Sequence, residues 1–271
     1  MNRYDRMFER LRAAKEGALV PFAVLGDPDP ESSLEVAEAL IAGGADALEL
    51  GLPFSDPIAD GPVIQAAASR ALAAGTTPSI CFGLVQQIRR RHPELPLGLL
   101  VYSNLVVRNR PEEFFARCAD AGVDSLLIAD IPSVEIGPFA ESAIAEGLSP
   151  ILIVPPNATQ ACLRAVAQWG RGYTYLLGRA GVTGTQTAMQ RPANERIETL
   201  RRLSAPPVLV GFGISTPEHV RTALECGSRG AIVGSAIVQI ISDSAADAKL
   251  RRRKLVEFVS SLKAATRANL I

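Results

Sequence analysis

Eight short apolar runs, each followed by a segment of helical character, constrain the fold of this chain most strongly. The runs lie at residues 18–24, 46–51, 97–102, 125–129, 151–154, 173–177, 208–211 and 230–233. Between them, apolar residues recur at three- and four-residue spacing in segments 32–42, 111–121, 136–146, 160–169, 194–203 and 217–226. Runs such as LGLLVY and SLLIA are typical of a parallel sheet covered by helices on both faces.

Strict alternation of strands and helices favours closure of the sheet into a barrel. A doubly wound open sheet is the alternative, but it would normally carry a Gly-x-Gly-x-x-Gly turn after its first strand, and the residues after Val24 are LGDP. The 271 residues suit one complete barrel, although two ordinary domains would also fit. We therefore expect an α/β protein with a single (β/α)8 TIM-barrel domain over residues 1–271, with long loops after its second and sixth strands at 52–62 and 178–192.

The composition indicates a compact globular protein. Hydrophobic residues make up 48% of the chain and charged residues 21%, and the formal net charge is zero, so no polyanionic partner is implied. A basic run at residues 251–254 lies inside an amphipathic segment, and we interpret it as a solvated helix face. We expect no nucleic-acid partner.

The amino-terminal 18 residues are charged every few positions, which predicts an extra helix before the first strand. They have neither the apolar core of a signal peptide nor the length of a membrane span. The cysteines are far apart and contain no Cys-x-x-Cys pair; they are Cys81, Cys118, Cys162 and Cys226. A cytoplasmic protein without membrane association fits these features best.

Glu49 is the most informative single residue, because it lies inside the apolar run DALELG. An ionised carboxylate facing the interior of a barrel would be costly, so we expect its pKa to be raised toward ~6–7, a value useful for proton transfer. A glutamate turned outward between helices, or one held in a structural ion pair, is the alternative.

Asp60 follows eleven residues later in the loop SDPIADGP. It would lie over the same end of the barrel, and two carboxylates in different environments can divide acid and base work. An aspartate before Gly-Pro is also ordinary turn chemistry, which is the alternative interpretation.

Glycine-rich turns predict a phosphate site. GVTGT spans 181–185, and GFGIS at 211–215 and GSA at 234–236 follow the seventh and eighth predicted strands. In barrels these two loops often bind phosphate through backbone N–H groups, with Gly213, Gly234 and Ser235 as donors here. Tight turns alone would also account for any one of these glycines.

The positions of lysine and histidine narrow the expected chemistry. No lysine lies at a predicted strand end, so a Schiff-base mechanism would have no nucleophile, and the two isolated histidines supply no metal cluster. We therefore expect acid–base chemistry on an organic phosphate, with no metal site.

Several motifs in this order resemble the tryptophan synthase α subunit along essentially the entire chain. They are VPFAVLGDP, GADALELGLPFSDPIADGPVIQ, GLLVYSNLV, GVDSLLIADIP, PPNA, GYTYLL, GVTG, GFGIS and GSAIV, of which LELGLPFSDPIADGP is the most specific. The resemblance implies a carbon–carbon lyase that cleaves indole-3-glycerol phosphate to indole and glyceraldehyde 3-phosphate in L-tryptophan biosynthesis.

The resemblance also implies roles for individual residues. Glu49 would be the acid–base group, and Asp60 would hydrogen-bond the indole N–H. The phosphate would be bound by Gly184, Gly213, Gly234 and Ser235. Phe22, Leu100, Leu127, Tyr175 and Phe212 would line the indole pocket, and Thr183 would close against Asp60 on a loop where Gly178 and Ala180 depart from several relatives.

The implied partner is a β subunit in an α2β2 heterotetramer, to which indole passes. Pyridoxal phosphate is expected only in that β subunit, and this chain is expected to need no cofactor. The alternatives are a stand-alone indole-releasing lyase, an idle regulatory subunit that binds the phosphate ligand, and an isomerase of the same barrel type. The intact Glu49 and Asp60 argue against the idle subunit, and the run LELGLPFSDPIADGP argues against the isomerase.

Overall fold

Strands and helices alternate along the chain as the sequence predicts. The computed structural model describes residues 1–108, 110–178, 186–211 and 213–267, with the backbone alone described for 186–192. The elements are α1 (Arg3–Ala14), β1 (Ala18–Val24), α2 (Pro30–Ala42), β2 (Leu48–Gly51), α3 (Pro62–Ala73), α4 (Pro78–Arg91), β3 (Leu97–Val101), α5 (Ser103–Val107), α6 (Pro111–Asp120), β4 (Ser125–Ile128), α7 (Gly137–Ala145), β5 (Ser149–Pro150), β6 (Leu152–Val154), α8 (Gln160–Trp169), β7 (Thr174–Leu177), α9 (Gln186–Arg202), β8 (Val208–Gly211), α10 (Pro217–Glu225), β9 (Gly230–Val233), α11 (Ser235–Asp243) and α12 (Ala248–Ala265).

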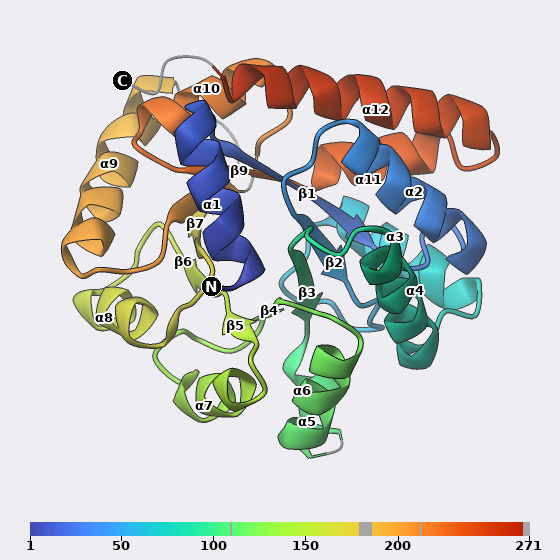
Figure 1. Ribbon diagram of the computed structural model, residues 1–271, viewed down its shortest axis with the longest axis horizontal. Coiled ribbons are helices and arrows are strands. Elements are labelled where there is room, and N and C mark those ends of the chain that lie inside the picture. Colours follow the sequence, from blue (N-terminus) through green and yellow to red (C-terminus); the bar gives the residue numbers. More distant parts are fainter. Residues whose placement is uncertain (109, 179–185, 212, 268–271) are drawn as a thin grey trace.

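The strands form a (β/α)8 TIM barrel, which confirms the predicted fold class. Neighbouring strands are parallel and follow the order β5-β4-β3-β2-β1-β9-β8-β7-β6, with the helices around them (Figure 1). The fifth predicted strand is divided into β5, which pairs with β4, and β6, which pairs with β7. Ile151, between these two short strands, donates its N–H to Leu126 at 2.9 Å, so the segment from Ser149 to Val154 closes the barrel.

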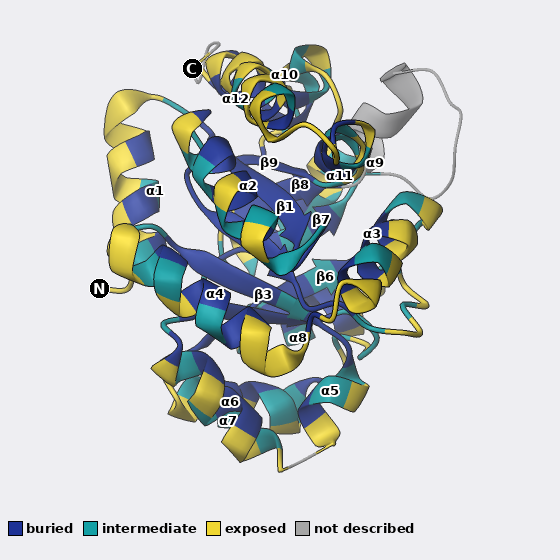
Figure 2. Ribbon diagram, turned by 90° about the vertical axis from the view of Figure 1, so that its right-hand side faces the viewer, coloured by how far each residue is buried: buried dark blue, intermediate teal, exposed yellow. Residues whose placement is uncertain are grey.

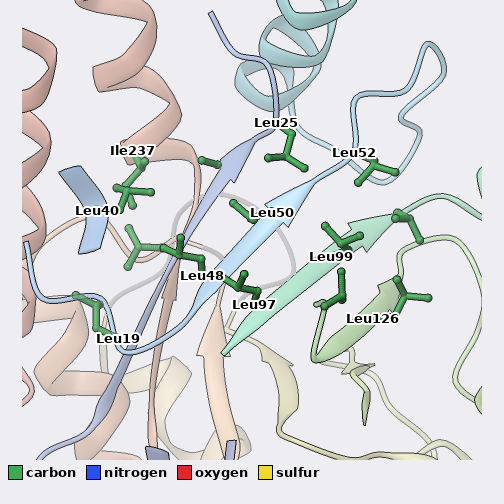
Figure 3. Packing of buried hydrophobic residues seen from close by; sticks show 14 of the residues in the cluster. Leu19, Leu25, Leu40, Leu48, Leu50, Leu52, Leu97, Leu99, Leu126 and Ile237 are labelled. Atoms are coloured by element: carbon green, nitrogen blue, oxygen red, sulfur yellow. The ribbon is translucent and has the colours of Figure 1, made fainter. Parts of the chain in front are cut away.

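Alternation along each strand separates two apolar layers. One face packs against the helices, as with Leu48 and Leu50 of β2 and Leu97 and Leu99 of β3, which belong to one buried cluster with Leu40 of α2 (Figure 3). The opposite face fills the barrel interior and includes Val20, Leu127, Tyr173, Leu209 and Ile232. The strands are therefore buried on both sides, while exposed residues lie on the outer faces of the helices (Figure 2).

The predicted amino-terminal helix α1 closes one end of the barrel. Tyr4, Met7 and Leu11 are each at most 3% exposed and pack with interior residues of the strands. Asn2 caps α1 and forms a capping box with Asp5, which fixes the start of the helix. The residues it contacts lie mainly near the beginnings of the strands, so α1 forms the floor of the barrel.

Of the two long loops predicted at 52–62 and 178–192, the structure describes the first in full and the second in part. The connection from β2 to α3 is long, as predicted, and carries Asp60. Helix α9 begins at Gln186, so the helical backbone includes part of the stretch that the sequence assigns to the second loop. No helix within the described residues is both long and apolar enough to cross a membrane.

The interpretation of the basic run 251–254 as a fully solvated face is wrong for its first residue. Arg251 is 2% exposed, whereas the three residues after it are exposed. Its Nη1 donates to the carbonyl oxygen of Ala245 at 2.8 Å, and its Nη2 lies 3.6 Å from a carboxylate oxygen of Glu35. The turn before α12 therefore holds this guanidinium group inside the protein.

A buried ion pair ties α12 to the barrel. The Asp46 carboxylate accepts hydrogen bonds from Lys263 Nζ at 2.8 Å, from the Leu19 N–H at 2.9 Å and from Arg10 at 2.8 Å. Asp46 and Lys263 are 4% and 9% exposed. Because Lys263 also bonds Glu16, both ends of the chain are held against the start of β1.

We expect Asp46→Ala to lower the free energy of unfolding by roughly 2–4 kcal/mol, since it leaves the buried Leu19 N–H unpaired and removes a partner of buried Lys263. Urea unfolding measures this loss. Arg10→Ala is the matched control: it removes a partner of the same carboxylate, but its side chain is 59% exposed, so the cost should be under ~1 kcal/mol. Equal losses in the two variants would contradict the prediction.

Candidate active site

The side chain of Glu49 points into the barrel. Leu48 and Leu50 pack outward against the helices, so the residue between them on the same strand faces inward. Glu49 is 3% exposed, and its Oε1 accepts a hydrogen bond from the Tyr173 hydroxyl at 2.8 Å. The alternative of an outward-facing glutamate is therefore excluded.

Burial raises the pKa of Glu49 to about 7. The hydrogen bond from Tyr173 acts in the opposite direction, and the negative charge of Asp60 raises the pKa further. A carboxyl group with this pKa can both donate and accept a proton near neutral pH. The raised pKa predicted from the sequence is thus present, and desolvation is its main cause.

Asp60 lies on the β2–α3 loop at the same end of the barrel. Its Oδ2 accepts a hydrogen bond from the Tyr102 hydroxyl at 2.8 Å, and its backbone oxygen accepts one from Gln65 Nε2 at 2.8 Å. The residue is half-buried, and burial raises its pKa while the Tyr102 hydrogen bond lowers it. The Asp60 charge also raises the pKa of Glu49, so the two carboxylates share one electrostatic environment.

The sequence analysis missed two tyrosines, Tyr102 and Tyr173. Tyr173 could have been found, because it lies two residues before Tyr175 and residues at this spacing share one face of a strand. Tyr102 follows directly after β3, a position that favours functional side chains in barrels. Its contact with Asp60 spans 42 residues, and no local pattern predicts it.

Four of the residues predicted for the indole pocket lie on the inner face of the barrel, the face that carries Glu49. Phe22 of β1 is the register partner of Glu49, and Leu100 of β3 is the partner of both Gly51 and Leu127. Leu127 is buried in the interior cluster, against which Leu100 and Tyr175 pack. Phe212, the fifth predicted residue, lies outside the described residues.

Two strand-end glycines leave room for the aromatic rings of this pocket. A Cβ atom on Gly51 would lie 2.8 Å from Cζ of Phe22, and one on Gly211 would overlap the hydroxyl of Tyr175. Real Cβ atoms do not approach other atoms so closely, so larger residues here would displace the rings. Glycine at these two positions therefore leaves room for the rings of Phe22 and Tyr175 at the strand ends.

The predicted phosphate donors follow β8 and β9. Gly213 has a φ of 83°, which favours glycine, and a Cβ atom there would meet nothing within 4 Å. Gly234 is the N-cap of α11 and Ser235 is its first residue, and no side chain caps this helix. Ser235 is an exposed residue at the start of this helix, so its N–H group can serve an anion. Gly184 and Thr183 lie outside the described residues.

Metal ligands were not predicted, and the described residues contain no cluster of three or more His, Cys, Asp or Glu side chains that could hold a metal ion. Cys81, Cys118 and Cys162 form no disulfide, and burial raises the pKa of Cys81, Cys118, Cys162 and Cys226. The titratable groups with shifted pKa values inside the barrel are Glu49, Asp60 and tyrosines.

Comparisons with known proteins show the family to which the chain is similar. A family model described as tryptophan synthase alpha chain matches residues 8–267. A tryptophan synthase alpha chain from Yersinia pseudotuberculosis serotype O:1b (strain IP 31758) is 54% identical over 268 residues, covering 99% of this chain and 100% of the relative. The crystal structure of tryptophan synthase subunit alpha from Legionella pneumophila str. Paris matches with a TM-score of 0.90 at 31% identity, covering 98% of each chain. A chain of the tryptophan synthase a2b2 complex from Pyrococcus furiosus matches with a TM-score of 0.82 at 35% identity, covering 91% of this chain and 98% of that chain.

Carboxylates gathered at the carboxyl ends of barrel strands define an enzyme of the (β/α)8 class, in which catalytic groups lie at that end. The chain belongs to the tryptophan synthase alpha chain family. It is a lyase, and it catalyses the α reaction of tryptophan biosynthesis.

We expect Glu49→Gln to stabilise the protein more at high pH than at low pH. Burial raises the pKa of Glu49 to about 7, so folding favours its protonated form, and this contribution to stability is lost as the pH rises from the unfolded-state value to about 7. The stability difference between variant and wild type should grow by about 2–3 kcal/mol from about pH 5 to about pH 8. Urea unfolding at both pH values measures it, and a pH-independent difference would show that Glu49 titrates normally.

Proposed function

We propose that this chain cleaves indole-3-glycerol phosphate to indole and D-glyceraldehyde 3-phosphate by a retro-aldol reaction. The observation that carries the proposal is the inward, buried Glu49, whose pKa is raised to about 7 by desolvation, beside the second carboxylate Asp60. Membership of the tryptophan synthase alpha chain family supports the same reaction.

Glu49 carries out both proton transfers in this mechanism. Its protonated carboxyl donates a proton to C3 of the indole ring, which makes the ring an acceptor for the electron pair of the adjacent C–C bond. The resulting carboxylate then takes the proton of the glycerol hydroxyl next to that bond. As the bond breaks, its electron pair restores the indole ring, the hydroxyl carbon becomes the aldehyde, and Glu49 regains its proton.

Metal-free acid–base catalysis follows from the chemistry of the substrate. The protonated indole ring is itself the electron sink, so neither a metal ion nor a Schiff base is required to stabilise the electrons of the broken bond. The step depends on an acid strong enough to protonate carbon yet still protonated near neutral pH. Desolvation of Glu49 supplies such an acid, and no cofactor is assigned to this chain.

Asp60 acts on the other side of the ring. Positive charge develops on the indole nitrogen when C3 is protonated, and the Asp60 carboxylate accepts the N–H hydrogen bond and stabilises that charge. Phe22, Leu100, Leu127, Tyr175 and Phe212 line the indole pocket. Gly184, Gly213, Gly234 and Ser235 bind the phosphate through backbone N–H groups at loops and at the start of α11, and Thr183 closes against Asp60.

We expect Glu49→Gln to lower kcat for indole release roughly 10²–10⁴-fold, because it removes the only group assigned to both proton transfers. Indole release is followed with wild type, Glu49→Gln and Asp60→Asn, each with excess β subunit, and binding of the phosphate substrate is measured in parallel. Binding should stay within about threefold of wild type in Glu49→Gln, since no phosphate contact changes.

Wild-type protein that released no indole, yet bound the substrate and stimulated the β reaction, would replace the lyase by a regulatory subunit. Efficient turnover without any β subunit would identify a stand-alone lyase. Either result would overturn a different part of the proposal, so the two alternatives are separable in one set of assays.

The partner is a β subunit in an α2β2 heterotetramer in the cytoplasm, to which indole passes and which holds pyridoxal phosphate. Three large apolar side chains support a docking face at the carboxyl ends of the strands: Ile58 is 81% exposed, Val107 48% and Val134 55%. They lie in the connections that follow β2, β3 and β4, which are neighbours in the sheet. Exposed apolar residues on adjacent loops are typical of protein interfaces.

We expect Ile58→Asp to weaken binding to a tryptophan synthase β subunit at least roughly tenfold, because it places a charge in an apolar contact. Titration calorimetry measures the affinity. Ala246→Asp, an equally charged change at an exposed site before α12, should leave binding within about twofold. Equal affinities of the two variants would place the partner on another face.

A further inference from the structure

Tyr102 connects Asp60 to the rest of the barrel. The residue follows β3 directly and is the N-cap of α5, and it is 2% exposed. Its hydroxyl donates a hydrogen bond to Oδ2 of Asp60 at 2.8 Å and accepts one from the N–H of Ala59 at 3.1 Å. The hydroxyl thus contacts both the side chain of Asp60 and the loop backbone next to it.

The position of Tyr102 is fixed by two further contacts. Its ring stacks on Phe54 with centroids 5.3 Å apart and an interplanar angle of 25°. The backbone that follows it is held by Asp130, which accepts bonds from the N–H of Ser103 at 2.7 Å and from the Ser103 hydroxyl at 2.6 Å. The hydroxyl therefore cannot move away from Asp60 without breaking packing or the cap of α5.

The two oxygens of the Asp60 carboxylate differ in their hydrogen bonding. Oδ2 is bound by Tyr102, whereas in the described part of the chain no hydrogen bond to Oδ1 is found. A carboxylate held through one oxygen presents the other in a defined direction. The side chain is half-buried, so its orientation depends on this contact more than it would at the surface.

We propose that Tyr102 is a positioning residue for the α reaction, whose hydroxyl aims the Asp60 carboxylate at the indole N–H. The proposal rests on the proposed lyase function. Tyr102 contacts no reacting atom in this scheme and acts through Asp60 alone. Loss of its hydroxyl should therefore lower kcat more than it raises KM.

The ionisation of Asp60 gives a readout that is independent of catalysis. Its pKa is raised by burial and lowered by the Tyr102 hydrogen bond, so Tyr102→Phe should raise it further. The other titratable groups that interact with this pair are Glu49 of β2, Tyr175 of β7 and Asp130 after β4. None of them changes in Tyr102→Phe.

The first measurement is the pKa of Asp60 in ligand-free protein, from carbon-13 NMR of the carboxyl groups, with the Asp60 signal identified by its loss in Asp60→Asn. Tyr4→Phe is the matched control, since it removes another buried hydroxyl that makes a 2.8 Å hydrogen bond, here to Ser125. We expect the Asp60 pKa to rise in Tyr102→Phe and to stay unchanged in Tyr4→Phe. An unchanged pKa in Tyr102→Phe would overturn the proposal.

The second measurement is a double-mutant cycle on indole release. Tyr102→Phe should lower kcat roughly tenfold in the wild-type background and less than about twofold in Asp60→Asn, because the hydroxyl acts only through the carboxylate. Equal losses in the two backgrounds would show a structural role instead. Phe54→Leu, which removes the stacking and keeps the hydroxyl, should shift both readouts in the same direction and serves if Tyr102→Phe does not fold.

The two measurements separate the proposals. Absence of lyase activity in wild type would remove the proposed function, while the NMR titration would still decide whether Tyr102 holds Asp60. Lyase activity with an unshifted Asp60 pKa would retain the function and remove the role of Tyr102.

Discussion

The buried carboxyl group of Glu49 requires a hydrogen-bond partner and an apolar environment, and the surrounding residues supply both. A charged group in the barrel interior is costly, so the carboxyl stays protonated up to a pH of about 7, and one of its oxygens receives the Tyr173 hydroxyl. Apolar walls maintain the desolvation, and Phe22 provides one of them directly across β1 and β2. Gly51 leaves space for the ring of Phe22, and Gly211 leaves space for the ring of Tyr175. The apolar side chains that line the pocket are thus the same ones that bury Glu49 and raise its pKa.

Much of the barrel could be predicted because its strands are continuous apolar runs separated by helices with a three- and four-residue repeat. The fifth strand was predicted only in part: the apolar run at 151–154 does not show that the strand already begins at Ser149, whose N–H bonds Asp124 just as the Ile151 N–H bonds Leu126. Arg251 was misread because a run of charges does not show which residue faces the turn before its helix. The carbonyl oxygens of Ser244 and Ala245, which receive its guanidinium, become neighbours only in the folded chain.

The candidate site could be predicted in part. Glu49 stood out because a carboxylate interrupts an apolar strand, and the alternation of β2 accounts for its inward direction. Asp60 was found by its place on a long loop. Tyr173 and Tyr102 were missed since their contacts bridge 124 and 42 residues, and a tyrosine in an apolar run resembles any core residue. Local sequence patterns thus identify a polar group such as Glu49 in an apolar strand. They do not identify the tyrosines that form hydrogen bonds with the two carboxylates.

Helix α1 closes the floor of the barrel, with Tyr4 packed edge-on against Tyr173 at a centroid distance of 5.6 Å. Because α1 covers the end where the strands begin, a substrate approaches Glu49 from the end where the strands finish. In the proposed binding mode the indole ring occupies the deeper position, and the glyceraldehyde 3-phosphate lies nearer the rim, beside Gly213 and Ser235. Both products then leave toward the carboxyl ends of the strands, the end on which the proposed docking face for the β subunit lies.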